Sequence, residues 1–169
     1  MRGVDIRRVL PADFSKLGQI FGAFLGRTYA ERSGLPGAVL VADADGALLA
    51  AVFVSTGRPT ESEIVERLGD VPMLHRLIVA VGHRRQLIGT RMIAAAEQML
   101  REAGHTQLAV GVDLDNEGAA RLYRRLGFQE WPHGVLKTIR EHGDADGNAI
   151  VTPDECRVFV KDLSPEEAA

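Results

Sequence analysis

The sequence predicts a mixed α/β fold in which strands and helices interleave and some neighbouring strands form hairpins. Apolar residues recur at helical spacing in several segments, and short runs rich in Val, Leu and Ala lie between glycine-containing turns. No repeat or linker divides the 169 residues, a length that suits one hydrophobic core. We therefore expect a single domain over residues 1–169, with a short acidic tail at 164–169.

The chain is expected to begin with a strand, a helix and a hairpin. Val4-Asp5-Ile6 alternates like a half-buried strand, and Pro11 ends that strand and begins a helix with apolar residues three and four apart. Asp43-Ala44-Asp45-Gly46 predicts a tight turn, because Asp-Gly favours hairpins. The strands that it would join are 38–41 and 48–55.

Three further segments complete the first half. Between residues 26 and 37, three glycines and a proline indicate a short helix or a loop. The polar segment at 60–68 predicts a short helix, with Thr60 or Ser62 as its N-cap. A strand follows at 72–81. Apolar residues occupy both its odd-numbered and its even-numbered positions, which indicates burial on both faces.

The second half is punctuated more clearly. An apolar stripe predicts a helix from Ile88, closed by Ala103-Gly104. Asp115 or Asn116 can cap a later helix, which Gly127 ends. The remaining elements are a strand at 107–112, that second helix at 117–126, and a final strand pair that begins at Phe128 and closes with 157–163.

Composition and charge exclude several classes of protein. The formal net charge is −3, from 20 basic and 23 acidic residues, which argues against a nucleic-acid partner. No apolar run approaches the ~20 residues that span a bilayer, and the N-terminal segment carries charges where a signal peptide would be apolar. Cys156 is the only cysteine, so an internal disulfide is excluded, and burial as a small apolar side chain is expected. We expect a cytoplasmic protein with no membrane partner.

The stretch from Val79 to Gly89 joins a buried strand to a helix through basic residues. A helix N-terminus leaves backbone N–H groups unpaired and carries partial positive charge, so it can hold phosphate. Arg84 and Arg85 would strengthen that field, although arginines at a helix start are often merely solvated. Neither the P-loop pattern nor the dinucleotide-binding fingerprint occurs in the sequence.

Two stretches resemble the hallmarks of a known family. Arg84-Arg85-Gln86-Leu87-Ile88-Gly89 resembles the Gln/Arg-x-x-Gly-x-Gly/Ala pyrophosphate loop of the GNAT superfamily of N-acetyltransferases. Residues 116–128 resemble their second hallmark, Asn-x-x-Ala-x-x-Leu-Tyr-x-x-x-Gly-Phe, which is the more specific of the two. Residues 6–13 and 158–163 are similar to the opening strand and helix and to the closing strand. The resemblance thus covers nearly the whole chain in order.

The resemblance implies a fold and an activity. The GNAT fold, α/β (α+β), has a central mixed, mostly antiparallel sheet of about seven strands flanked by about four helices. Its members transfer the acetyl group of acetyl-CoA, the cosubstrate, directly to an amine without an acyl-enzyme. The acceptor would be an amine of a small molecule or of a peptide or protein, and a homodimer would be in keeping with the family.

The resemblance also implies where the cosubstrate binds. The strand would pair with pantetheine, and a backbone N–H around Val79 could stabilise the thioester oxyanion. The loop and helix start would hold the pyrophosphate through backbone N–H groups. The implied cofactor-binding residues are Leu77, Ile78, Val79, Ala80 and Val81 in the strand, Arg84, Arg85, Gln86, Leu87, Ile88, Gly89 and Thr90 in the loop, and Asn116, Ala119 and Tyr123 in the second hallmark.

One loop position departs from the family pattern. The first loop glycine is replaced by Leu87. Glycine there would let the backbone approach phosphate closely and adopt unusual φ/ψ, whereas a leucine can still present its N–H if its backbone is helical, with a weaker affinity for acetyl-CoA as one consequence. The departure motivates an alternative function, a CoA-binding domain without catalysis.

Tyr123 is the predicted general acid for the thiolate leaving group, by its match to the family tyrosine. Its place on an apolar helical stripe would otherwise indicate a core residue with its hydroxyl at the rim. Asn116 has two compatible roles, as a helix cap and as a support for the cofactor region.

Two residues are candidates for the general base. The family often uses a Glu on the strand before the loop, but no carboxylate occurs between Val71 and Val81. His75, expected on the strand face of Met73 and Leu77, titrates near neutrality and could serve, although a lone strand histidine is more often structural. Asp113, at the end of the next strand, is the competitor, or else a turn-forming residue.

A calcium site is a less favoured alternative, and we predict no metal as part of the catalytic site. Residues 144–155 resemble an EF-hand loop, with Asp144, Asp146, Asn148 and Glu155 at ligand positions. The glycine that the loop's sharp turn requires is Ala149 here. Because Asp-Ala-Asp-Gly also occurs at 43–46, a hairpin turn used twice is the simpler interpretation.

Overall fold

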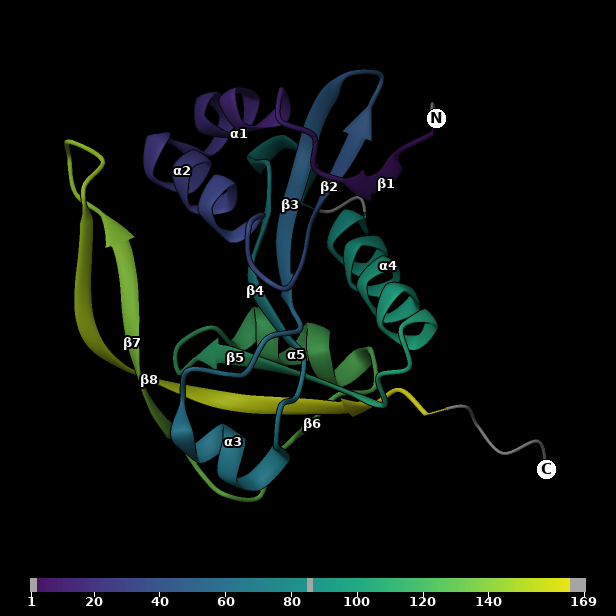
Figure 1. Cartoon of the computed structure of the whole chain (residues 1–169), viewed down its shortest axis with the longest axis vertical. Coiled ribbons are helices and arrows are strands. Elements are labelled where there is room, and N and C mark those ends of the chain that lie inside the picture. The colour runs from purple at the N-terminus through teal and green to yellow at the C-terminus, as the bar shows by residue number, and fades with distance from the viewer. Residues whose placement is uncertain (1–2, 85–86, 165–169) are drawn as a thin grey trace.

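The computed structural model describes residues 3–84 and 87–164. One eight-stranded sheet forms its body, with the path β1-β2-β3-β4-β5-β8-β6 and β7 paired to β8 (Figure 1). The strands are β1 (Asp5–Arg8), β2 (Gly37–Ala44), β3 (Ala47–Ser55), β4 (Met73–Val79), β5 (Gln107–Asp113), β6 (Gln129–Glu130), β7 (Leu136–Gly143) and β8 (Ala149–Asp162). Among the described strands, only β4 and β5 run parallel to each other. The predicted mixed, mostly antiparallel sheet is confirmed.

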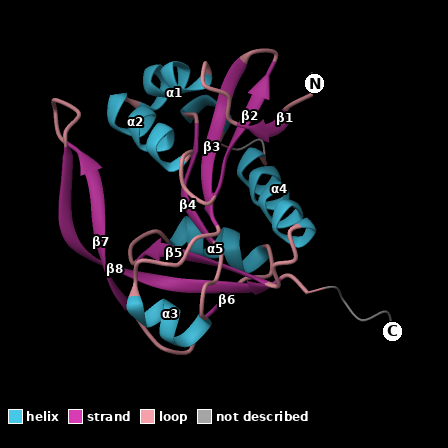
Figure 2. Cartoon of the chain, viewed as in Figure 1, coloured by secondary structure: helices cyan, strands magenta, loops and turns pink. Residues whose placement is uncertain are grey.

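Helices cover both faces of this sheet (Figure 2). They are α1 (Asp13–Phe21), α2 (Ala23–Arg32), α3 (Ser62–Leu68), α4 (Ile88–Glu102) and α5 (Glu117–Arg125), with a 3₁₀ turn η1 (Val81–His83). Residues 26–37, expected to form a short helix or a loop, contain most of α2, which begins directly after Gly22. None of the helices in the described ranges is long and apolar enough to cross a lipid bilayer.

Two apolar layers lie on the opposite faces of the sheet. Residues of α4 and α5 pack on the face that includes Leu40 and Leu74, which we call the α4 face. On the other face, called the α1–α2 face, Leu17 of α1 and Tyr29 of α2 pack against Phe53. The short helix α3 packs on that same face through Ile64, against Met73 and other residues of the second half of the sheet.

Both Asp-Ala-Asp-Gly segments form hairpin turns, as the simpler interpretation predicted. Asp43 accepts a hydrogen bond from the N–H of Gly46 (2.7 Å) between β2 and β3. Asp144 Oδ1 accepts from the N–H groups of Asp146 (2.9 Å) and Asn148 (2.8 Å) between β7 and β8. A short polar side chain that binds nearby backbone N–H groups stabilises each tight turn.

The last strand is much longer than the expected 157–163. It begins at Ala149 and pairs with β7 as far as Cys156, then with β5. Its first half escaped the sequence analysis because this ribbon is largely exposed and lacks a buried apolar face. The N-cap of α3 was also predicted wrongly: it is Glu61, with no side-chain cap hydrogen bond, and not Thr60 or Ser62.

Candidate active site

The central feature of the site is a gap between β4 and β5. Within the described ranges these strands pair only at Met73–Ala109 and Leu74–Val110, and beyond Leu74 they diverge. In Figure 2, β5 and β8 run across the direction of β3 and β4. The edge of β4 that faces β5 therefore lacks a strand partner along its C-terminal half.

A β-bulge at Arg76 shapes this half of β4. The register pairs His75 with Phe53 and Ile78 with Ala51, so β4 has one residue more than β3 between these pairs. Arg76 has φ +56°, an uncommon conformation for a residue other than glycine. The hydroxyl of the fully buried Tyr29 donates a hydrogen bond to the carbonyl of Arg76. Helix α2 thus holds the bulge in place.

The bulge reverses the faces of the following residues. Leu77 and Val79 pack on the α4 face, and Ile78 packs on the α1–α2 face. His75, paired with Phe53, stays on the α1–α2 face. The prediction that His75 and Leu77 share a face is therefore wrong, because a regular alternation had no place for the extra residue.

Backbone groups of β4 point into the gap. The N–H of Ala80 donates to the carbonyl of Leu49 (2.8 Å). In an antiparallel pair hydrogen-bonded residues alternate with those that face away, so Ile78 and Ala80 face β3 while the N–H of Val79 faces the gap. Val79 is the residue around which the sequence analysis placed the oxyanion donor.

The N-terminus of α4 lies next to this strand. Gly89, in its first turn, approaches the side chains of Leu77 and Val79, since a Cβ there would lie 4.0 and 3.9 Å from them. The first turn holds no acidic residue, and no side chain caps it among the described residues. The N–H groups of Ile88, Gly89 and Thr90 precede the first intrahelical bond, from Arg91 N to Leu87 O (3.0 Å).

Leu87 adopts the conformation that its replaced glycine would favour. It is the N-cap of α4 with φ +60° and ψ +17°, in the left-handed region. The right-handed helical backbone named as a condition for Leu87 to present its N–H is therefore not the one that it adopts. Its side chain is 66% exposed, so it adds little to the buried core. Leu87 thus keeps the left-handed backbone conformation that a glycine would favour at this position.

The basic residues of the loop are only partly described. Arg84 Nε donates to the carbonyl of Val79 (3.3 Å), which holds this exposed guanidinium against the strand end. Arg85 and Gln86, predicted to bind pyrophosphate, lie outside the described residues. Val81 lies in the 3₁₀ turn η1 and is 79% exposed, so it belongs to the loop and not to the strand.

Tyr123 lies on the α4 face, in the same apolar cluster as Leu77 and Val79. It is 5% exposed and stacks edge-on against Phe128 at 5.2 Å between ring centroids. Burial raises the pKa of its phenol to about 12, so the group stays protonated at neutral pH. Its hydroxyl makes no hydrogen bond in the described part of the chain.

Asn116 caps α5, as one of its two expected roles requires. Its side-chain oxygen accepts a hydrogen bond from the N–H of Ala119 (3.1 Å). Ala119 itself packs against the cluster that holds Tyr123. The cap therefore fixes the start of the helix that carries the tyrosine.

His75 lies at the vertex of the gap, one residue after the last β4–β5 pair. Its ring stacks on Phe53 at 5.7 Å between centroids. Desolvation lowers the pKa of His75, and Arg32 and Arg76 lower it further, while the charge of Glu61 opposes them. The imidazole is therefore neutral near pH 7, as a proton acceptor must be.

Asp113 is engaged elsewhere. Its carboxylate forms an ion pair with Arg140 of β7 (2.8 Å), and both side chains are nearly half exposed. This placement favours His75 over Asp113 as the base.

Sequence analysis missed several residues that the structure brings to this region. They are Tyr29, Arg76, Glu61 and Thr138, from α2, β4, the N-cap of α3 and β7. Arg76, a charged residue inside the apolar run 72–81, was the one feature of the sequence that indicated the bulge. Glu61 and Thr138 carried no signal, because only the tertiary fold brings them together.

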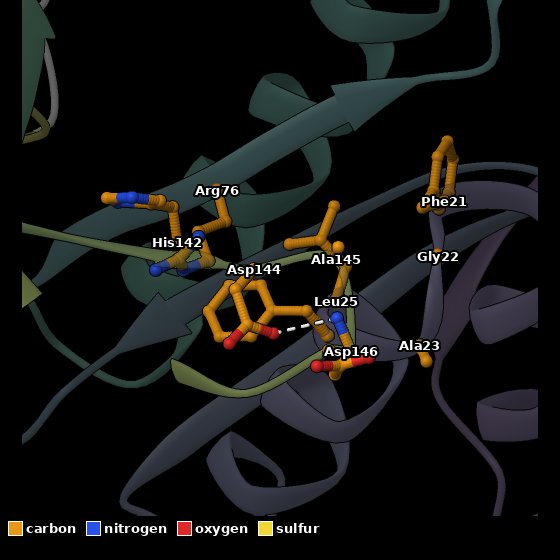
Figure 3. A pocket seen from close by; sticks show the side chains of 12 residues that line it. Phe21, Gly22, Ala23, Leu25, Arg76, His142, Asp144, Ala145 and Asp146 are labelled. Carbon is orange, nitrogen blue, oxygen red and sulfur yellow. Dashed lines mark hydrogen bonds between the residues drawn. The ribbon is translucent and has the colours of Figure 1, made fainter. Parts of the chain in front are cut away.

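A cavity of about 580 Å³ opens next to the bulge on the α1–α2 face (Figure 3). Residues 21–25 form an apolar side, and Arg76 and the tip of the β7–β8 hairpin at 142–147 form the other. The guanidinium of Arg76 lies over the ring of Phe24 at 5.4 Å and donates to the carbonyl of Glu141 (2.7 Å). The cavity thus adjoins the vertex from the side opposite to Tyr123.

The EF-hand-like residues do not surround a common point. Asp144, Asp146 and Asn148 lie in the hairpin turn, whereas Glu155 lies far along β8, opposite Lys137. No group of three or more His, Cys, Asp or Glu residues in the described ranges could hold a metal ion. Cys156 is 7% exposed, and burial raises the pKa of its thiol to about 12, which confirms the expected buried side chain.

Comparison with known proteins agrees with this architecture. The profile of the acetyltransferase (GNAT) family matches residues 6–128, more than half of the chain. The chain belongs to this family, and the predicted GNAT fold is confirmed. A search of curated protein sequences finds no match.

Solved structures share the fold at low sequence identity. The ribosomal-protein-S18-alanine N-acetyltransferase of Escherichia coli has a TM-score of 0.67 and 18% identity, covering 98% of this chain and 97% of that one. An aminoglycoside 6′-N-acetyltransferase complexed with coenzyme A has a TM-score of 0.68 and 16% identity, covering 97% and 99%. A putative acetyltransferase from Salmonella typhimurium with acetyl-CoA has a TM-score of 0.65 and 18% identity, covering 98% and 96%.

Proposed function

We propose that the protein is an N-acetyltransferase that transfers the acetyl group of acetyl-CoA directly to an amine of a small molecule or a peptide. The observation that carries this proposal is the gap between β4 and β5, whose unpaired strand edge adjoins the uncapped N-terminus of α4. Membership of the GNAT family supports acyl transfer as the reaction class.

The residues at the gap fit acetyl-CoA. The free edge of β4, with Val79 facing the gap, offers hydrogen bonds to the amides of pantetheine. The N–H groups of Ile88, Gly89 and Thr90 and the positive end of α4 suit a pyrophosphate. Leu87 keeps a left-handed backbone with its side chain exposed, so it does not oppose this fit.

When bound, acetyl-CoA supplies a thioester whose acetyl group passes to the amine nitrogen. The N–H of Val79 would stabilise the negative charge that develops on the carbonyl oxygen. Tyr123, on the α4 face, would donate a hydrogen bond and then a proton to the departing sulfur. The phenol retains its proton until that step, because its pKa is about 12.

His75 would act as the base from the opposite face of the sheet. The ammonium form of the acceptor must lose a proton before nitrogen can attack, and a neutral imidazole can take it. Because Tyr123 and His75 lie on different faces, thioester and amine would approach each other through the gap. This arrangement requires no acyl-enzyme.

Thiol release from acetyl-CoA with a panel of amines tests the proposal. We expect Tyr123→Phe to lower kcat by ~10²- to 10⁴-fold, the usual contribution of an acid catalyst, and to change the Kd of coenzyme A far less than kcat. Because the hydroxyl makes no hydrogen bond among the described residues, the free energy of unfolding should also stay unchanged.

A CoA-binding domain without catalysis is the second candidate, motivated by Leu87 and by the absence of a Glu on β4. It would be supported if coenzyme A binds, if no amine in the panel releases thiol, and if Tyr123→Phe changes neither result.

We also propose a cytoplasmic location, which cell fractionation tests, and a homodimer, which sedimentation velocity tests.

A further inference from the structure

One partly buried carboxylate near the vertex has no role in the steps described above. Glu61 is the N-cap residue of α3, in the connection between β3 and β4. Its Oε1 accepts a hydrogen bond from Thr138 Oγ1 of β7 (3.0 Å). Its Oε2 is shielded from solvent and has no hydrogen-bond partner among the described residues. A buried carboxylate oxygen without a donor is costly, so a ligand that donates to it would be stabilised there.

The surroundings of Glu61 place it at the vertex of the gap. Ile64, in the same turn of α3, packs in one cluster with Met73 of β4, Ala109 of β5, Leu136 of β7 and Cys156 of β8. The charge of Glu61 acts to raise the pKa of Cys156 and opposes the desolvation that lowers the pKa of His75. Cys156 Sγ lies 3.2 Å from where a Cβ of Gly111 would stand, and Gly111 of β5 directly follows the last residue paired with β4. Elements α3, β4, β5, β7 and β8 therefore meet around this carboxylate on the α1–α2 face.

The nearby arginines do not supply the missing donor. Arg32 of α2 forms its ion pair with Glu141 (3.4 Å). Arg76 donates to the backbone carbonyl of Glu141 (2.7 Å). His75 is neutral near pH 7, because desolvation and these two arginines outweigh the charge of Glu61. No cation among the described residues therefore pairs with Glu61 Oε2, which is left for a cationic ligand.

We propose that Glu61 binds the ammonium group of the acceptor amine and holds it beside His75. This inference rests on the proposed function and deepens it, since it names a class of acceptor: alkyl amines that are protonated at neutral pH. One N–H of the ammonium donates to Glu61 Oε2. A second N–H bond breaks, its proton passes to the imidazole of His75, and its electron pair stays on nitrogen as the attacking lone pair. Glu61 stabilises the imidazolium that results.

The probes are benzylammonium and benzyl alcohol, which have similar shape but differ in charge. Benzylammonium should shift the NMR signals of the His75 imidazole in the unmodified protein, and benzyl alcohol should not. Glu61→Gln keeps the size of the side chain and the bond from Thr138, and should weaken benzylammonium binding ~10- to 100-fold. It should also lower the pKa of His75, since it removes the neighbouring negative charge. Glu63→Gln, on an exposed side chain of the same helix, is the matched control and should change neither.

The outcomes separate this inference from the proposed function. Equal benzylammonium binding by the unmodified protein and Glu61→Gln, including no binding by either, overturns the ammonium site. If binding depends on Glu61 but no amine releases thiol from acetyl-CoA, the site stands and the proposed function fails. If thiol is released and Glu61→Gln leaves KM for every alkyl amine unchanged, the proposed function stands and the role of Glu61 is wrong.

Discussion

At the scale of single residues, backbone conformation matters as much as side-chain identity. Arg76 and Leu87 both adopt positive φ without being glycine, at the bulge of β4 and at the start of α4. Such conformations cost of order 1 kcal/mol each and persist where surrounding contacts fix them. Both positions flank the gap, whereas the third described residue of this kind, Asp45, lies in the turn between β2 and β3.

Replacing Leu87 by glycine and by alanine tests this strain. Both variants remove the exposed side chain, but only glycine relieves the left-handed conformation. We expect the free energy of unfolding of Leu87→Gly to be about 1 kcal/mol higher than that of Leu87→Ala. The greater entropy of glycine in the unfolded chain reduces this difference. Urea denaturation measures the difference, and a less stable glycine variant would contradict the assigned conformation.

At the scale of elements, polar groups tie helices to strands at two places. Tyr29 of α2 fixes the bulge of β4 through the carbonyl of Arg76. At the start of α1, the carboxylate of Asp13 is 2% exposed and accepts bonds from Arg7 Nη1 (2.8 Å) and from the N–H of Leu10 (2.6 Å). Arg7 also pairs with Asp43 of β2 (3.1 Å), so α1, β1 and β2 share one network.

Tyr29→Phe should destabilise the protein by about 1–3 kcal/mol, because the buried carbonyl of Arg76 loses its side-chain donor. We expect His75 to change its NMR signal as well, since the bulge sets its orientation. Tyr123→Phe is the control, because that hydroxyl has no partner among the described residues. Loss of stability in the control and not in Tyr29→Phe would refute the assignment.

Asp13→Asn should cost about 3 kcal/mol, because it leaves a buried ion pair broken. The hydrogen bond from Arg7 lowers the pKa of Asp13 below its ordinary value of 3.8. The unfolded chain therefore binds this proton more readily, and the stabilisation is fully present above that value and lost as pH falls through the folded-state pKa. Thermal unfolding between pH 7 and 2 should show a smaller acid loss in Asp13→Asn than in the unmodified protein.

At the scale of the whole molecule, two halves of one sheet meet along a short seam. Strands β1–β4 form one half of the sheet, and β5–β8 form the other. Among the described residues, two β-ladder pairs join the halves, Met73–Ala109 and Leu74–Val110. Beyond this seam no pair of described residues joins the two halves through a β-ladder. The acid and base candidates lie on opposite faces of this sheet.

Hydrogen exchange along β4 should report this arrangement. Without ligand, the N–H of Val79 should exchange faster than those of Ile78 and Ala80, because only the latter two face β3. Coenzyme A should slow the exchange of Val79 and leave its two neighbours nearly unchanged. Equal protection of all three without ligand would mean that the edge of β4 is covered.

The sequence predicted what depends on local pattern. Helical spacing located α4 and α5, Asp-Gly located both hairpin turns, and Asn116 was recognised as a cap. The bulge at Arg76 was missed because one inserted residue leaves the apolar character of β4 unchanged. Glu61 and Thr138 were missed for a different reason, since they are 77 positions apart and only tertiary packing joins them. The long β8 was missed because an exposed ribbon needs no apolar face.

The β7–β8 ribbon bears on how the acceptor specificity of the protein could be changed. Its tip, residues 143–147, walls the cavity beside the bulge and packs closely on α2, where Gly143 lies against Phe24 and Gly147 against Arg27. The scaffold and the catalytic candidates lie elsewhere. Changing the charge of the turn at residues 144–146, with Gly143 and Gly147 kept, should therefore alter acceptor choice while leaving the coenzyme affinity unchanged.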